Sequence, residues 1–168
     1  MLFPKLYFED ITFITPEVLA EHGIKGLLID VDNTLSPYGN VSISESVRAH
    51  IKMLRQCGFK MILLSNNFNK RVSQASKLLE LSHVSFGIKP LPFGYIKAKK
   101  LLQLNRKEIA VVGDQIFTDI LGANLLGIFS VLVEPLDKGH EGITLRIRRA
   151  FEKHILKIYH KRNREDIS

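Results

Sequence analysis

Two carboxylates one residue apart, Asp30 and Asp32, follow an apolar run at residues 26–29. An uninterrupted run of this kind is typical of a strand that is buried on both faces of a parallel sheet. Open parallel sheets bind ligands at the carboxyl ends of their strands. Acids in this position therefore predict a charged site at that edge of the sheet.

Three later segments place further polar groups after apolar or β-like stretches. Ser65, Asn66 and Asn67 follow the run at 61–64, and Lys89 lies in a turn after residues 83–86. Asp114 and Asp119 follow the run at 109–113. A single Asp after a strand is usually a turn or capping residue. Acids, a hydroxyl and a lysine that all follow strands favour a shared site instead.

This set, in this order, resembles the haloacid dehalogenase superfamily of aspartate-nucleophile phosphatases. The first motif is matched by Asp30-Val31-Asp32-Asn33-Thr34-Leu35, the second by Ser65, the third by Lys89, and the fourth by Gly113-Asp114 through Asp119. The resemblance covers roughly residues 24–135. The combination is specific, whereas a lone Asp-x-Asp pair would be weak.

The resemblance implies roles for the acids. Asp30 would be the nucleophile that forms an aspartyl-phosphate, and Asp32 the general acid that later activates water as a base. Several acids repel one another and a dianionic substrate, so we expect a divalent cation, and hard oxygen ligands suit Mg²⁺. Its implied ligands are the Asp30 carboxylate, the Asp32 backbone carbonyl and Asp114. Asp119 would bind through water or orient its neighbours.

The remaining motif residues are expected to bind the phosphate ester. Ser65 would hold the phosphoryl oxygens, and Lys89 would balance their charge. Thr34, Asn66 and Asn67 are substrate-binding candidates, although Thr34 also suits the turn after Asp32. For the two asparagines a purely structural role is equally favoured, because strand-to-helix turns select Asn for its backbone geometry.

Strands and helices alternate along the chain, which predicts an α/β fold with a Rossmann-like core. We expect a five-stranded, mostly parallel sheet with helices on both faces. The strands are predicted at about 26–29, 60–64, 83–86, 109–113 and 130–133, and the helices at 16–22, from a cap at Ser42 to Gly58, at 68–81, at 92–103, and from a cap at Thr118 to Gly127. Asp30 and Ser65 are 35 residues apart, and Ser65 and Lys89 are 24 apart, which leaves no room for a cap domain. The site should therefore be open.

The positive charge of the chain is concentrated near its end. Residues 143–164 contain eight Lys or Arg and one Glu, whereas the rest of the chain has sixteen of each sign, so this segment accounts for the net charge of +7. Its apolar spacing predicts a basic amphipathic helix within a single domain of residues 1–168. Such a helix either docks on the sheet with a solvated basic face or lies on an anionic membrane.

Within the superfamily the motifs look most like the bacterial YqeG-type subfamily IIIA phosphatases, whose mitochondrial and plastid relatives are phosphatidylglycerophosphate phosphatases. This resemblance implies a phosphate-ester substrate, an anionic phospholipid among the candidates, and peripheral membrane contact. One alternative is a soluble phosphatase of a nucleotide, sugar phosphate or phosphoprotein. Another is an RNA- or protein-binding module that uses the basic tail. Nucleic acid is the weaker partner, because few aromatic residues accompany the cations. The sequence leaves the oligomeric state open.

The apolar runs and the amino-terminal residues give an expectation for the cellular location of the protein. No apolar run approaches the roughly 20 residues that span a bilayer, and the amino terminus lacks the pattern of a secretion signal. We therefore expect a cytoplasmic protein, either free or peripheral on the inner membrane face. Residues 1–14 are apolar without a helical period. An extended arm over an edge of the core is favoured there over a surface that meets lipid or a partner.

Overall fold

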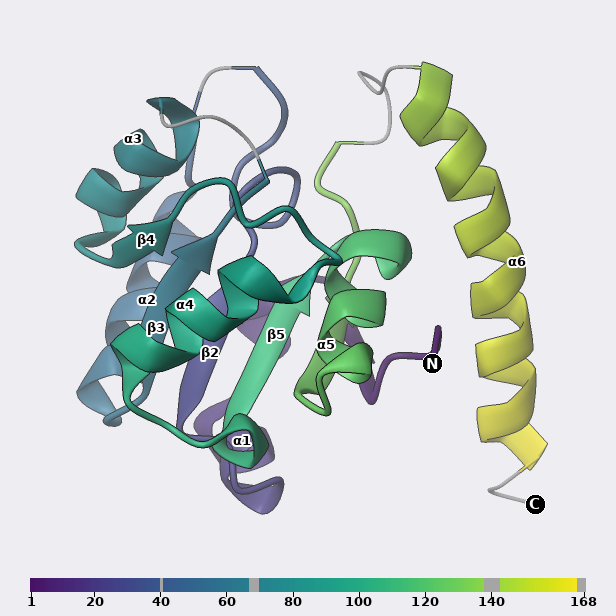
Figure 1. The fold of residues 1–168 in the computed structure, drawn as a ribbon, viewed down its shortest axis with the longest axis horizontal. Helices are drawn as coiled ribbons and strands as arrows, with labels where there is room; N and C mark the ends of the chain where they lie inside the picture. Colours follow the sequence, from purple (N-terminus) through teal and green to yellow (C-terminus); the bar gives the residue numbers. More distant parts are fainter. Residues whose placement is uncertain (40, 67–69, 138–142, 166–168) are drawn as a thin grey trace.

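The apolar runs form a sheet of six parallel strands in the computed structural model, which describes residues 1–39, 41–66, 70–137 and 143–165 (Figure 1). The strands are β1 (Leu6–Phe8), β2 (Gly26–Ile29), β3 (Lys60–Leu64), β4 (Ser82–Val84), β5 (Ile109–Gly113) and β6 (Phe129–Val133). Their order across the sheet is β1-β6-β5-β2-β3-β4. The predicted α/β class with a parallel sheet is confirmed.

The predicted count of five strands is wrong, because the amino-terminal arm contributes a sixth. β1 pairs in parallel with β6, with Leu6 opposite Val131 and Phe8 opposite Val133. The arm lies at an edge of the sheet, as expected. A strand of three residues is too short to show the alternation by which strands are recognised in a sequence.

The helices lie close to their predicted positions. They are α1 (Pro16–Glu21), α2 (Glu45–Gln56), α3 (Lys70–Leu79), α4 (Pro92–Leu102), α5 (Leu121–Leu125) and α6 (Ile143–Glu165), with short helical turns η1 (Ile11–Phe13), η2 (Arg106–Glu108) and η3 (Ile116–Ile120). The cap of α2 is Ser44, whose hydroxyl accepts from the Val47 amide, and not Ser42, whose amide donates to Ser36. Thr118 does not begin a helix either, because it lies inside the π-helical η3.

Helices cover both faces of the sheet, and each face has its own apolar cluster. Alternate residues of β2 point to opposite faces, so Leu27 and Ile29 pack with α1, α2 and α3, whereas Leu28 packs with α4 and α5. Figure 1 shows α4 and α5 in front of the sheet. Because both faces of the central strands are covered, the runs in the sequence are apolar without alternation.

The central strands are β2 and β5, and chain order reverses between them. β2 pairs with β3 on one side and with β5 on the other. The crevice at such a reversal, outside the carboxyl ends of the strands, is where open α/β sheets bind ligands.

α6 packs along η3 and beside the β1 and β6 strands at one side of the sheet. Ile155 and Leu156 pack against Ile116, Ile120 and Leu132. Aromatic contacts join the helix to the amino-terminal arm, with ring centroids 6.2 Å apart for Phe3 and Tyr159 and 5.3 Å apart for Tyr7 and His160. One side of the predicted basic helix is therefore docked on the core.

Candidate active site

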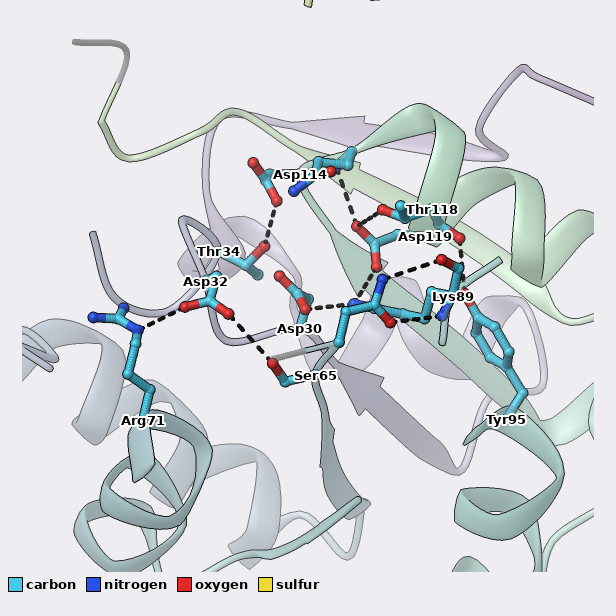
Figure 2. A network of polar contacts seen from close by, with 12 residues as sticks. Asp30, Asp32, Thr34, Ser65, Arg71, Lys89, Tyr95, Asp114, Thr118 and Asp119 are labelled. Atoms are coloured by element: carbon cyan, nitrogen blue, oxygen red, sulfur yellow. Dashed lines mark hydrogen bonds and ion pairs between the residues drawn. The ribbon is translucent and has the colours of Figure 1, made fainter. Parts of the chain in front are cut away.

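The side chains predicted to form the site meet at the carboxyl edge of the central strands (Figure 2). Asp30 follows β2, Asp114 follows β5 and Ser65 follows β3, and all three are buried. Lys89, from the turn after β4, reaches into the same cluster and is also buried. The parallel register places these strand ends side by side, although the residues lie far apart in the sequence.

Lys89 links the acids of the first and fourth motifs. Its ammonium donates to Asp30 Oδ1 and, at 2.6 Å, to Asp119 Oδ1. Asn66 holds the backbone of this turn, since its Oδ1 accepts from the Lys89 amide at 2.6 Å and its Nδ2 donates to the Lys89 carbonyl at 3.1 Å. Asn66 therefore positions the lysine with both ends of its amide. Asn67 lies outside the described residues.

Asp32 turns back toward Ser65 after β2. Its Oδ2 accepts from Ser65 Oγ at 3.3 Å, and its Oδ1 accepts from Arg71 Nε at 2.7 Å. The turn depends on Asn33, whose φ of 63° is left-handed. Asn tolerates this conformation better than most residues. The Asn33 side chain also makes two hydrogen bonds of 2.7 Å with the backbone of Asp137, which ties the turn to the segment after β6.

Thr34 and Asp119 complete the cluster around Asp114. Thr34 Oγ1 donates to Asp114 Oδ1 at 3.3 Å. Asp119 is fully buried, and its Oδ2 accepts from the Gln115 amide and from Thr118 Oγ1, both at 3.2 Å. Gly113 is required at the end of β5, because a side chain there would collide with the Asp119 carboxylate.

Burial and the charges of neighbouring side chains set the pKa values of Asp30 and Lys89 in the cluster. Burial raises the pKa of Asp30 well above its ordinary value, Asp119 and Asp114 raise it further, and Lys89 opposes them. For Lys89, burial favours the neutral amine, but Asp119 and Asp30 outweigh it and raise the pKa of the ammonium. Lys89 is thus held as a cation between two carboxylates.

Asp30, Asp114 and Asp119 fit a cation site. One carboxylate oxygen of each lies within 4.8 Å of the others, and all three residues are buried. Lys89 supplies one positive charge to this group, which is fewer than the negative charges that three ionised acids carry. Buried charges need partners, and a hard cation prefers oxygen ligands. Asp32, the fourth predicted metal residue, is expected to contribute its backbone carbonyl, and its side chain contacts Ser65 and Arg71.

The structure adds residues that the sequence did not single out. Arg71, on α3, pairs with Asp32 and also donates to the Pro37 and Gly39 carbonyls. The sequence does not indicate which residue an Arg at the start of a helix will pair with, because the partner here lies on a distant turn. Tyr95 is fully buried, and its hydroxyl donates to the Thr118 carbonyl at 2.9 Å behind the cluster.

Glu152 is the third such residue, and it connects α6 to the fourth motif. Its Oε1 accepts from the Ile116 amide at 2.7 Å and from the Phe117 amide at 3.4 Å, where η3 begins. Its exposed fraction is 3%. In the sequence, the available signal was that Glu152 is the one acid in residues 143–164, which contain eight Lys or Arg. A cavity of about 310 Å³ lies beside it, lined also by Asp114, Leu132 and Leu156.

Acids after the two central strands, with a lysine between them, define a phosphatase of the haloacid dehalogenase type. The profile of the family described as mitochondrial PGP phosphatase matches residues 1–136, and the chain belongs to this family.

The relatives agree with this assignment. The chain is 31% identical over 153 residues to "Probable phosphatase YqeG" of Bacillus subtilis, covering 91% of this chain and 88% of that protein. It is 33% identical over 137 residues to the mitochondrial phosphatidylglycerophosphatase GEP4 of Saccharomyces cerevisiae, covering 73% of each. The fold resembles the cobalt-bound deoxy-D-mannose-octulosonate 8-phosphate phosphatase of Haemophilus influenzae, with a TM-score of 0.53 and 16% identity over 68% of this chain and 80% of that chain.

Among the helices that the structure describes, none combines the length and the apolar character needed to span a bilayer.

Proposed function

We propose that this phosphatase hydrolyses phosphatidylglycerophosphate at a membrane surface, with Mg²⁺ as cofactor and Asp30 as nucleophile. The observation that carries the proposal is the buried cluster of Asp30, Asp114 and Asp119 around Lys89. The lipid substrate is supported by the family and by the yeast relative, which is named for this activity.

The proposed reaction uses Asp30 as the nucleophile and Asp32 as the acid and base. A carboxylate oxygen of Asp30 attacks phosphorus, the bond from phosphorus to the leaving oxygen breaks, and Asp32 gives that oxygen a proton. Water then attacks the aspartyl-phosphate, and Asp32 takes the proton of the water as phosphate leaves. Arg71 and Ser65 orient the Asp32 carboxylate through both of its oxygens.

Other residues bind the phosphoryl group. Lys89, held as a cation, balances its negative charge, and the Ser65 hydroxyl offers a donor. Asp30, Asp114 and Asp119 would hold Mg²⁺, which supplies further charge neutralisation when bound. The cobalt-bound Haemophilus neighbour supports a divalent cation in this fold.

The membrane setting is supported by the basic chain and by the short connection from β2 to α2. Among its described residues this connection holds one isolated strand-like pair, Asp32 with Ser36, and no further helix or strand. A site at the sheet edge without an inserted domain at this point suits a head group presented by a lipid surface. The cavity beside Asp114 offers space for part of the alcohol that leaves.

The test is phosphate release from phosphatidylglycerophosphate in phosphatidylcholine vesicles with Mg²⁺. Soluble phosphomonoesters are assayed in parallel, and the Asp30→Asn variant, purified in the same way, tests the nucleophile. We expect release from the lipid that depends on Mg²⁺ and on Asp30. Release from soluble esters alone would overturn the lipid substrate and leave the phosphatase. Equal activity of Asp30→Asn would overturn the nucleophile.

A further inference from the structure

Large apolar side chains are exposed around the turn that carries Lys89. Five of them lie within eleven residues, with exposed fractions from 42% to 65%: Phe86, Ile88, Leu91, Phe93 and Ile96. Leu101, exposed to 54%, follows on α4. Scattered apolar residues are ordinary on a protein surface, but a gathered set marks an interaction site.

The turn and the helix form one surface. Gly87 and Gly94 pack backbone to backbone, since a Cβ at Gly94 would lie 2.5 Å from the Gly87 Cα. The two residues flanking Gly87 therefore lie against the first turn of α4. Along α4, residues 93, 96, 97, 100 and 101 follow the spacing of one helix face, opposite the buried Tyr95, Ala98 and Leu102. We call residues 86, 88, 91, 93, 96 and 101 the α4 patch.

The backbone of the turn is unusual for apolar residues. Phe86 and Ile88 have φ values of 54° and 48°. This left-handed conformation is rare for bulky residues and particularly for β-branched ones. Such conformations persist where the surroundings hold them and are common at functional sites. The turn presents both side chains outward while Lys89, one residue later, points into the acid cluster.

The charged residues of this surface are all basic. Between Glu80 and Glu108 the chain contains no acidic residue. Lys97 and Lys100 share the exposed face of α4 with Phe93 and Ile96. Apolar groups bordered by lysines match an anionic lipid surface, where the apolar side chains enter the interface and the cations contact the head groups.

A second copy of the chain fits this surface less well. A symmetric dimer through the α4 patch would place the same lysines of both copies in one interface. The segment has no acid to pair with them, and like charges in an interface are unfavourable.

We infer that the α4 patch, with Lys97 and Lys100, is the surface by which this phosphatase docks on an anionic bilayer, so that the Lys89 turn faces the lipid head groups. This inference rests on the proposed function for the identity of the lipid substrate, whereas the binding to the bilayer is argued from the α4 patch itself. It assigns membrane contact to α4, whereas the charge of the sequence drew attention to α6.

The test is sedimentation of the full chain with vesicles of phosphatidylcholine and phosphatidylglycerol, and with vesicles of phosphatidylcholine alone. The variant Phe93→Asp with Ile96→Asp is compared with Phe13→Asp. Phe13 is also exposed, to 51%, but belongs to η1, which contacts α2 on the opposite face. Hydrolysis of a soluble phosphomonoester reports that each variant is folded.

We expect binding to the anionic vesicles, a loss of at least about tenfold in the α4 patch variant and little change in Phe13→Asp, with soluble-ester hydrolysis unchanged in both. Binding that survives the double substitution but is lost after Lys153→Glu and Lys157→Glu would move the docking surface to α6 and overturn the inference. A wild-type dimer that dissociates in the variant would assign the patch to self-association and overturn it as well.

The two proposals fail in different ways. Absence of vesicle binding by the wild type overturns the docking inference whatever the enzyme hydrolyses. Vesicle binding through the α4 patch without release from phosphatidylglycerophosphate supports the docking surface and overturns the lipid substrate.

Discussion

Asp30 occupies a position that no neighbouring acid can take over. Its carboxylate contacts Lys89, and so does Asp119, but Asp119 is also held by the start of η3, and Asp32 is held by Ser65 and Arg71. We expect Asp30→Asn to lower kcat for a soluble phosphomonoester by on the order of 10⁴-fold, since removal of a nucleophile costs this much or more in well-studied hydrolases. Phosphate release measures it. Glu80→Gln, at an exposed acid, is the control, and activity of Asp30→Asn within tenfold of the wild type would contradict the role.

Arg71 is a positioning residue for Asp32. Its side chain joins α3 to the turn that carries the acid and to the carbonyls of Pro37 and Gly39. We expect Arg71→Ala to lower kcat about tenfold to a hundredfold with a smaller effect on KM, because a misplaced acid–base group slows the chemical steps. Arg71→Lys should restore little, because an ammonium cannot reproduce the fork of donors.

Arg55→Ala provides the matched control for Arg71. Arg55 pairs with Glu80 at the exposed end of α3, away from the acid cluster. Its removal should leave kcat within about twofold of the wild type, since exposed ion pairs contribute little. Equal kcat values for Arg71→Ala and Arg55→Ala would show that Asp32 needs no such partner.

At the scale of elements, the buried side chain of Glu152 links α6 to the fourth motif of the active site. Glu152→Ala leaves the Ile116 and Phe117 amides without their acceptor. We expect the free energy of unfolding to fall by about 1–3 kcal/mol, the cost of unsatisfied buried donors. Denaturant unfolding measures it. Lys153→Ala, one residue along and exposed, should change stability by less than about 0.5 kcal/mol. Equal stabilities of the two variants would mean that α6 is held by its apolar contacts alone.

The close packing of two glycines holds the Lys89 turn on α4. A Cβ at Gly94 would lie 2.6 Å from the Gly87 carbonyl oxygen, so Gly94→Ala forces the turn to move. We expect a loss of about 1–3 kcal/mol of stability and at least a tenfold fall in kcat, because Lys89 moves with its turn. Wild-type kinetics in a folded Gly94→Ala protein would show that the turn adjusts without moving the lysine.

At the scale of the whole molecule, the acid cluster links cation binding to stability. In the metal-free protein, burial first and then Asp119 and Asp114 raise the pKa of Asp30 above its ordinary 3.8. The folded chain then holds a proton that the unfolded chain releases. This stability is present below the ordinary pKa and is lost as the pH rises through the raised value. In thermal unfolding without metal, the Tm should therefore fall as the pH rises from the ordinary pKa of Asp30 through its raised pKa.

Addition of a divalent cation should reverse this loss. A ligand at a hundred times its Kd stabilises the folded state by about 2.7 kcal/mol, which is about 5–10 °C in Tm for a chain of this size. We expect this rise with Mg²⁺ near neutral pH and its loss in Asp114→Asn. The same rise in Asp114→Asn would place the cation elsewhere.

The strands around the site and the motif residues were predictable because their signals are local. The apolar runs before Asp30, Ser65 and Asp114 are continuous, since both faces of a central parallel strand are buried. β1 gave no comparable signal, because a three-residue strand owes its conformation to pairing with β6. The cap of α2 at Ser44 instead of Ser42 shows the same limit, because either serine suits a cap and the contact of Ser42 with Ser36 settles the choice.

The sequence by itself determined the class of fold, the four strand-end motifs and the family, because these depend on residue types at fixed spacings along the chain. Only the tertiary structure decided that Arg71 holds Asp32, that Asn66 holds the Lys89 turn and that Glu152 joins α6 to η3. Each of these contacts joins residues 23 to 39 positions apart. Such pairs are set by how helices pack on the sheet, and spacing along the chain carries no record of that packing.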